Sequence, residues 1–194
     1  MLPRLFSLVL PALVLCACPS DPVAVPPRGR VEVAAVDRRE LLDAFCEVRP
    51  PVDEAPWLSF PPLDSSAPVR GAGWTWVSLW ATWCGPCLEE LPLLRSWQAE
   101  LSTPAHPLNL VFLSVDADAA VLARARAASS RLPAGPRLLD PAGVETWLAS
   151  MGLDAGASIP IHLLVDPQGK VRCIRVGAVS APDRAAVAAL LAGG

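Results

Sequence analysis

The apolar and polar positions of the chain alternate in blocks that predict a mixed order of strands and helices. Four apolar runs have the length and composition of strands: residues 74–80, 108–115, 161–165 and 170–177. Segments with helical spacing of apolar positions lie between and after these runs, at residues 84–101, 118–131, 144–151 and 182–192. Helices interleaved with apolar strands, ending in a hairpin, favour a layered α/β fold.

Individual residues mark where several of these elements begin and end. Asp118 and Ser180 stand where an N-cap is expected, because their side-chain oxygens accept hydrogen bonds from the free N–H groups of a first helical turn. Gly152 follows the helix at 144–151 and suits its C-terminal turn. Residues 137–139 are too short to assign to an element.

The region before residue 74 has a weaker pattern. Residues 31–36 predict a strand, and residues 37–48 predict an amphipathic helix that opens with an Asp37-x-x-Glu40 capping pattern. Residues 50–70 are Pro-rich and irregular, apart from a short edge strand expected at 57–60. We therefore expect an N-terminal extension at 31–55 and a main domain at 56–194.

The first 30 residues have the pattern of an export signal followed by a tether. A short basic start precedes an apolar run at 5–15, which is too short to span a bilayer. The segment 15–18 resembles a bacterial lipobox, in which cleavage after residue 17 leaves Cys18 lipidated. A soluble exported protein cleaved nearby and an uncleaved anchor are the alternatives. Residues 18–30 are Pro-rich and lack periodicity, as expected of a tether from the membrane.

Composition and charge limit the remaining possibilities. Cleavage after residue 17 leaves about 177 residues, which suffice for a single core. The net charge of −3 provides no basic footprint, and no nucleic-acid motif is present, so no nucleic-acid partner is expected. The apolar fraction of 53% is inflated by the signal and by alanine, and predicts no membrane domain.

A Cys84-Gly85-Pro86-Cys87 motif carries the clearest chemistry, because two thiols three positions apart can cycle between dithiol and disulfide. The motif lies at a predicted strand-to-helix junction, where free N–H groups and the helix dipole stabilise a thiolate on Cys84 and lower its pKa. Cys87 lies one turn further in, a position that suits a resolving thiol. Pro86 fits the first helical turn. A structural zinc site would need two more ligands at suitable spacing, which the sequence lacks, so no metal is expected.

At this point the chain resembles the thioredoxin superfamily, and within it the membrane-tethered thiol-disulfide oxidoreductases of the TlpA/ResA type. The resemblance covers about residues 56–191. It rests on the segment 80–87, on Pro92 in the following helix, on Ile159-Pro160 before an apolar strand, and on the turn at 166–170. It implies a three-layer sandwich in which a mixed central sheet is flanked by helices.

The same resemblance implies roles for residues around the thiols. Pro160 is expected to be cis and to pack against the active-site disulfide, while the backbone of Ile159 holds an extended substrate. Trp83 is expected to cover the thiols and a substrate groove. The implied activity is reduction of disulfides in exported proteins, for example in cytochrome c maturation, with no cofactor besides the Cys84–Cys87 couple.

Partners and location follow from this activity. A reductase in an oxidising compartment needs a membrane thiol-disulfide electron donor, and the predicted lipid places the domain on the periplasmic side of a bacterial cell envelope. A thioredoxin-like Cu(I)-binding module, using both thiols and His162, is the rival from another class. Peroxide reduction is a second rival, although peroxidases of this superfamily carry a lone reactive cysteine.

The proton acceptor for the resolving thiol is not evident from the sequence. Ser78 stands where many thioredoxins carry a buried acid, so Asp116 is the candidate, although an exposed turn residue is its simpler interpretation. If Asp116 does not serve, a water molecule or Glu89 or Glu90 must accept the proton, although both glutamates are interpreted first as acids on a solvated helix face. His162 is interpreted as a half-exposed strand residue.

Cys46 and Cys173 remain after the other cysteines are assigned. In an oxidising compartment these two can form a structural disulfide, which would join the N-terminal extension to the edge of the sheet. Two buried inert thiols and a second redox pair are the alternatives, because connectivity cannot be deduced from sequence.

Overall fold

The computed structural model describes residues 37–67 and 72–193. The signal at 1–17, Cys18, the tether at 18–30 and the strand expected at 31–36 lie outside the described residues. No helix within the described ranges is both long and apolar enough to cross a membrane.

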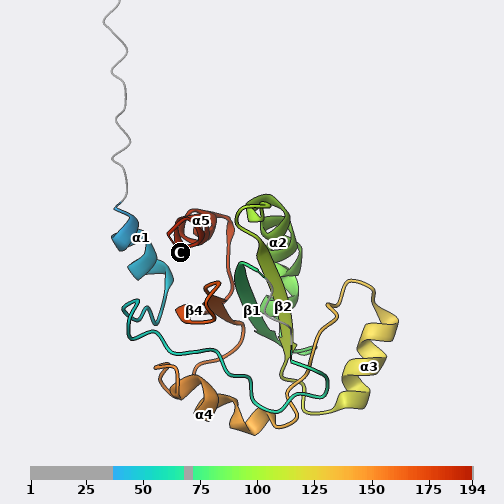
Figure 1. Ribbon diagram of the computed structural model, residues 1–194. Coiled ribbons are helices and arrows are strands. Elements are labelled where there is room, and N and C mark those ends of the chain that lie inside the picture. The colour runs from blue at the N-terminus through green and yellow to red at the C-terminus, as the bar shows by residue number, and fades with distance from the viewer. Residues whose placement is uncertain (1–36, 68–71, 194) are drawn as a thin grey trace, which may run out of the picture. The chain divides into compact units, whose positions relative to one another are not determined.

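A four-stranded mixed sheet forms the centre of the domain (Figure 1). Its strands are β1 (Trp74–Trp80), β2 (Leu108–Ser114), β3 (Ile161–Val165) and β4 (Val171–Val176), in the order β2-β1-β3-β4. β1 pairs with β2 in parallel, whereas the β1/β3 and β3/β4 pairs are antiparallel. β1 is buried along its whole length, as expected of an inner strand covered on both faces.

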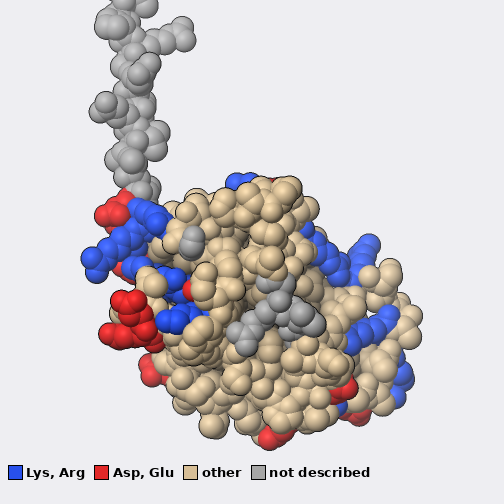
Figure 2. Space-filling model, in the orientation of Figure 1, with Lys and Arg blue, Asp and Glu red and all other residues tan. Residues whose placement is uncertain are grey.

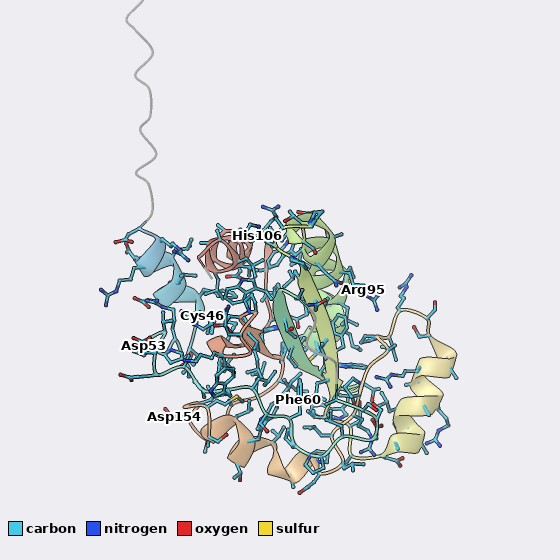
Figure 3. The ribbon with its side chains drawn as sticks, in the orientation of Figure 1. Cys46, Asp53, Phe60, Arg95, His106 and Asp154 are labelled. Atoms are coloured by element: carbon cyan, nitrogen blue, oxygen red, sulfur yellow. A yellow bond between two sulfur atoms is a disulfide. The ribbon has the colours of Figure 1, made fainter. Side chains whose placement is uncertain are left out.

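Helices cover both faces of this sheet. One face packs against α1 (Arg38–Phe45), α2 (Gly85–Leu101) and α5 (Arg184–Leu191), with Trp76, Trp80 and Trp97 in the shared core. The other face packs against α4 (Val144–Ala149), where Trp147 lies 6.1 Å from Phe60, ring centre to ring centre (Figure 3). α3 (Ala119–Ala128) follows β2 and contributes Leu122 to the first core. The expected three-layer α/β sandwich is confirmed.

Predicted capping positions agree with the observed ones. Asp118 accepts hydrogen bonds from the N–H groups of Ala120 and Val121, which lower the pKa of its carboxyl, the Val121 bond most. Ser180 and Asp183 form a capping box before α5. Gly152 has φ +91°, a conformation that glycine tolerates best, but it lies two residues beyond the C-cap Ser150, because α4 ends at Ala149 and not at Met151 as expected.

Four further predicted elements are corrected by the structure. The helix expected at 37–48 ends at Phe45, because Cys46 turns to extended backbone and Val48 then bridges Ile174 of β4. The edge strand expected at 57–60 is only an isolated bridge between Trp57 and Lys170. The helices expected at 118–131 and 182–192 are shorter, spanning Ala119–Ala128 and Arg184–Leu191, the latter preceded by a 3-10 turn.

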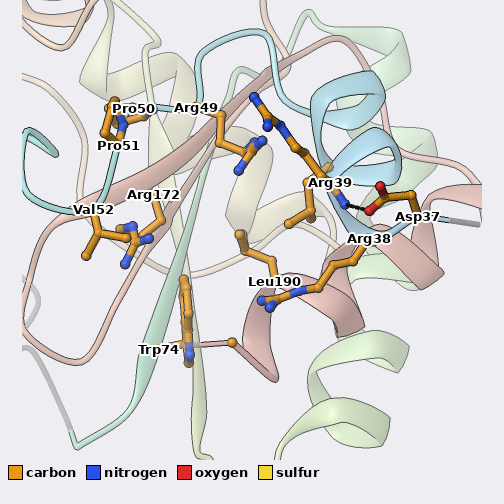
Figure 4. A pocket seen from close by; sticks show the side chains of 12 residues that line it. Asp37, Arg38, Arg39, Arg49, Pro50, Pro51, Val52, Trp74, Arg172 and Leu190 are labelled. Carbon is orange, nitrogen blue, oxygen red and sulfur yellow. Dashed lines mark hydrogen bonds between the residues drawn. The ribbon is translucent and has the colours of Figure 1, made fainter.

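A hollow of about 610 Å³ opens between α1, the segment 49–52 and the end of α5 (Figure 4). Four guanidinium groups line it, and each has a partner: Arg38 with the carbonyl of Ala189, Arg39 and Arg49 with Asp43, and Arg172 with Asp166. Basic and acidic side chains lie next to one another beside α1 on the face shown in Figure 2. Because each of these guanidinium groups already has a partner within the protein, we assign no ligand to the hollow.

Candidate active site

Cys84 and Cys87 lie at the junction between β1 and α2. Cys84 is the N-cap of α2, and its sulfur accepts the N–H of Cys87 at 3.3 Å. The two sulfurs are joined by a disulfide of 2.01 Å. Cys84 keeps 5% of its surface exposed and Cys87 none. The geometry therefore brings together a thiol pair in which only the first member borders solvent.

The loop before β3 lies against this pair. The Ile159–Pro160 peptide bond is cis, and the carbonyl oxygen of Ile159 lies 3.8 Å from the sulfur of Cys84. The carbonyl oxygen of Pro160 accepts the N–H of Gly177, which ties the loop to the end of β4. Residues 75 positions apart in the sequence thus form one site.

The surface around the thiols is open. Trp83 keeps 70% of its side chain exposed, so this indole is not packed tightly over the disulfide as a cover. Gly85 and Pro86 are also exposed, and nothing lies within 4 Å of a Cβ built on Gly85. Trp80, in contrast, is fully buried in the sheet. The open side of the disulfide can therefore admit an extended peptide.

Asp116 is buried, which corrects its interpretation as an exposed turn residue. Its side chain is only 2% exposed, and its oxygens accept the N–H of Thr82 at 3.1 and 3.2 Å and the hydroxyl of Thr82 at 2.6 Å. The hydroxyl of Ser114 donates to it at 2.8 Å. Since Thr82 lies two residues before Cys84, we assign Asp116 the positioning of the turn that presents the thiols.

Arg137, for which the sequence predicts no role, extends this network. The guanidinium donates to the carbonyl oxygens of Leu138 at 2.8 Å and Asp116 at 3.3 Å, and Asp64 lies 3.6 Å away. Nearby, burial lowers the pKa of Arg126, whereas the charges of Asp64 and Asp116 oppose this shift. A lone arginine in an unassigned segment carries no sequence signal for such a role.

We expect replacement of Asp116 by alanine to lower the free energy of unfolding by about 2–4 kcal/mol, because the Thr82 and Ser114 donors lose their acceptor inside the protein. Urea denaturation of the oxidised protein measures this change. Asp118→Ala is the control, since that carboxylate caps α3 at the surface and should have the smaller effect. Equal effects of the two substitutions would contradict the positioning role.

Glu90 and His162 are both buried, which corrects their interpretation as exposed residues. Glu90 is 4% exposed and His162 is fully buried. Both ring nitrogens of His162 face protein groups: Nδ1 accepts from the indole N–H of Trp76 at 3.2 Å, and Nε2 lies 3.3 Å from a carboxylate oxygen of Glu90. His162 is therefore not directed at a metal held by the thiols, which removes the third ligand of the copper alternative.

Cys46 and Cys173 form a second disulfide, with an S–S distance of 2.00 Å. Cys46 directly follows α1 (Figure 3), and Cys173 lies on β4. Both are buried, so this bridge has no open approach for a substrate. In the described part of the chain, no group of three or more His, Cys, Asp or Glu side chains is placed to hold a metal ion.

Comparison with solved structures identifies the fold. A thioredoxin-related protein from Neisseria meningitidis serogroup B superposes with a TM-score of 0.53 at 20% identity, over 68% of this chain and 95% of the other. This likeness shows a thioredoxin-like fold.

Two further solved structures are similar at lower TM-scores. A secreted thiol-disulfide isomerase from Corynebacterium glutamicum has a TM-score of 0.49 at 22% identity, over 63% of this chain and 72% of the other. A protein assigned as thiol:disulfide interchange protein DsbE from Chlorobium tepidum has a TM-score of 0.48 at 27% identity, over 63% and 81%. No protein-family model and no curated protein matches the sequence.

Proposed function

We propose that this protein is an extracytoplasmic thiol-disulfide oxidoreductase that reduces disulfides of exported proteins. The observation that carries the proposal is the position of the Cys84–Cys87 disulfide, at the start of α2 and beside the Ile159 carbonyl. The thioredoxin-like fold supports it, since it presents a thiol pair at a helix N-terminus where a thiolate is favoured.

The reaction proceeds by two thiol-disulfide exchanges. The Cys84 thiolate attacks one sulfur of a substrate disulfide, forms a mixed disulfide, and releases the other substrate sulfur as a thiolate. The Cys87 thiol then loses its proton and attacks the sulfur of Cys84. This step breaks the mixed disulfide and releases the second substrate thiolate. Two electrons have passed to the substrate, and Cys84 and Cys87 are joined again.

The substrate lies along the loop before β3. An extended peptide next to the Ile159 carbonyl has its N–H groups within reach of that acceptor, in the manner of strand addition to a sheet edge. The exposed indole of Trp83 supplies an apolar contact at the open side of the pair. Such recognition uses backbone groups, which suits a reductase that acts on several unfolded partners, cytochrome c precursors with oxidised haem-attachment cysteines among them.

Location and regeneration complete the proposal. Lipidation of Cys18 anchors the chain on the periplasmic side of the envelope, with residues 18–30 as the tether. The Cys46–Cys173 disulfide supports such a location, because disulfides that persist occur in oxidising compartments. A membrane thiol-disulfide donor then returns electrons to the Cys84–Cys87 couple after each turnover.

The direction of electron flow is tested by the reduction potential of the Cys84–Cys87 couple, measured by glutathione equilibration of the tether-free domain. For a reductase we expect a potential near that of thioredoxin, about −270 mV. A value near that of strong oxidants, about −120 mV, would reverse the proposed direction. Catalysed reduction of insulin by dithiothreitol, measured alongside, tests the activity itself.

A further inference from the structure

Three arginines from separate segments lie at the β2 edge of the sheet. Arg95 is on α2, Arg126 is on α3, and Arg131 is in the loop that follows α3. Arg95 Nη2 donates to the carbonyl oxygen of Arg131 at 3.0 Å, and its guanidinium lies 5.8 Å from the ring centre of Phe112 on β2. The guanidinium of Arg126 lies 5.8 Å from the ring centre of Trp80. Mainly basic side chains show along the α3 side of the molecule in Figure 2, and Figure 3 labels Arg95 there.

None of these three arginines is paired with an acid. Among the residues that the structure describes, no carboxylate oxygen lies within 4.0 Å of their nitrogens, whereas five other arginines each have such a partner: Arg39, Arg49, Arg137, Arg172 and Arg184. Instead, Arg126 donates to the carbonyl oxygens of Pro133 at 2.9 Å and Gly135 at 3.1 Å, in the loop that also carries Arg131. A carbonyl oxygen brings no net charge, and each guanidinium has five N–H donors. The three side chains therefore keep their positive charge and have donors left for a partner.

The acids of the neighbouring segments are engaged elsewhere. Three of them already have partners within the protein: Asp64, Asp116 and Asp118. The charges of Asp64 and Asp116 reach Arg126 only at longer range than an ion pair. On α2, Glu89 stands six positions before Arg95, which places the two about 120° apart around the helix. A basic surface is thus left largely uncompensated on a chain whose net charge is −3.

One face of α2 connects this surface to the thiols. Leu88, Pro92 and Arg95 follow one another at spacings of four and three, so they lie on the same side of the helix. Leu88 is half-buried, and the other two are exposed. At 1.5 Å per residue, Arg95 lies about 16 Å along the helix from Cys84. An extended peptide bound at Cys84 covers that distance with about five residues.

We propose that Arg95, Arg126 and Arg131 form a docking surface for an acidic stretch of the disulfide-bearing protein. Preferred substrates then carry aspartate or glutamate about four to six residues from the reactive cysteine. The inference rests on the proposed function, because the surface serves the same thiols. Carboxylates match guanidinium donors in both charge and geometry. A protein partner is favoured over an anionic membrane because the surface continues along α2 to the thiols, where the protein substrate must bind.

Rate constants for peptide disulfides test this surface. Each peptide carries one cysteine linked to pyridine-2-thiol, and attack by Cys84 of the reduced protein on the peptide sulfur releases the coloured thione. The peptides differ only about four to six residues from the cysteine, on either side, where they carry glutamates, glutamines or lysines. At an ionic strength of about 0.02 M, we expect a glutamate peptide to react about tenfold faster than its glutamine counterpart, and the lysine peptide to react slowest. At about 0.5 M salt, the preference should fall below about twofold because the charges are screened.

The variant Arg95→Gln/Arg131→Gln removes two of the charges and keeps Arg126, which holds the loop at 133–135. We expect its preference for the glutamate peptide to fall below about threefold, with an unchanged rate for the glutamine peptide. Arg38→Gln/Arg39→Gln is the matched control, since it removes the same charge from exposed positions on α1. The control should keep the tenfold preference. All proteins start at residue 18 and carry Cys18→Ser, so that neither a lipid nor a stray thiol contributes.

The outcomes separate the docking surface from the proposed function. Equal rates for the glutamate and glutamine peptides at low salt, or an equal loss of preference in both double variants, would overturn the docking surface. Vesicles of phosphatidylglycerol and phosphatidylcholine test the membrane as the occupant. If they retained the unsubstituted protein but not Arg95→Gln/Arg131→Gln, while the peptides reacted alike, the surface would belong to the membrane and the proposal would be wrong. If the unsubstituted protein released no coloured thione from any peptide, the proposed function itself would fail.

Discussion

Replacement of Cys84 by serine is expected to abolish insulin reduction, whereas replacement of Cys87 by serine should arrest the reaction halfway. A serine hydroxyl is not ionised near neutral pH and cannot act as the attacking thiolate. Cys87 cannot substitute for it, because it has no exposed surface. In Cys87→Ser, Cys84 still attacks, but no thiol can resolve the mixed disulfide. The trapped species should therefore carry the substrate on Cys84.

Mass spectrometry of the trapped species, digested without reductant, identifies the bonded cysteine. The double variant Cys46→Ala/Cys173→Ala is the matched control, since it removes the other disulfide and should keep the activity of the folded protein. If Cys84→Ser formed the mixed disulfide at Cys87, the roles of the two thiols would be exchanged. If the control lost activity while folded, the second disulfide would take part in electron transfer.

Sequence reasoning succeeded where the determinants are local. The strand at Trp74–Trp80 is an apolar run interrupted only by Thr75 and Ser78, and the caps at Asp118 and Ser180 depend on side chains that bind backbone within three residues. The thiol motif belongs to the same class, because four consecutive residues contain both sulfurs and the helix start. Such features depend only on residues that are close together in the sequence.

It failed where burial depends on distant segments. Glu90 follows Glu89 on a helix, and nothing near it in sequence indicates that Val179, 89 residues later, will pack over its carboxylate. His162 was interpreted as half exposed because one face of a strand often meets solvent, yet α2 covers that face here. Asp116 is buried because Thr82, 34 residues earlier, turns its backbone toward the carboxylate. These contacts between residues distant in the sequence determine which polar side chains near the site are buried.

From the sequence alone, a Cys46–Cys173 disulfide was one of three possibilities. A backbone contact between segments far apart in the sequence brings the two cysteines together. Val48 pairs with Ile174 through reciprocal backbone hydrogen bonds of 2.8 and 3.1 Å, which brings the chain after α1 alongside β4. This pairing explains both the early end of α1 and the approach of the two sulfurs. α1 is thereby attached to the sheet through a short bridge and a disulfide.

Removal of this attachment should have the largest effect on stability. Cys46 and Cys173 are 127 residues apart, so their disulfide closes most of the domain into one loop and restricts the unfolded chain strongly. A loop of that length corresponds to about 5 kcal/mol in the chain-entropy description, and losses on removal are typically about 2–5 kcal/mol. We expect Cys46→Ala/Cys173→Ala to lower the free energy of unfolding within that range.

The measurement is urea denaturation in a background in which Cys84 and Cys87 are both serine, so that Cys46–Cys173 is the one disulfide left among the described residues. The parent variant Cys84→Ser/Cys87→Ser, in which the Cys46–Cys173 disulfide is intact, is the control. Reduction of the parent by dithiothreitol should reproduce the alanine effect, because both treatments open the same loop. A loss below about 1 kcal/mol would contradict the expectation, and would indicate that Leu42 and Phe45 hold α1 on the core by packing alone.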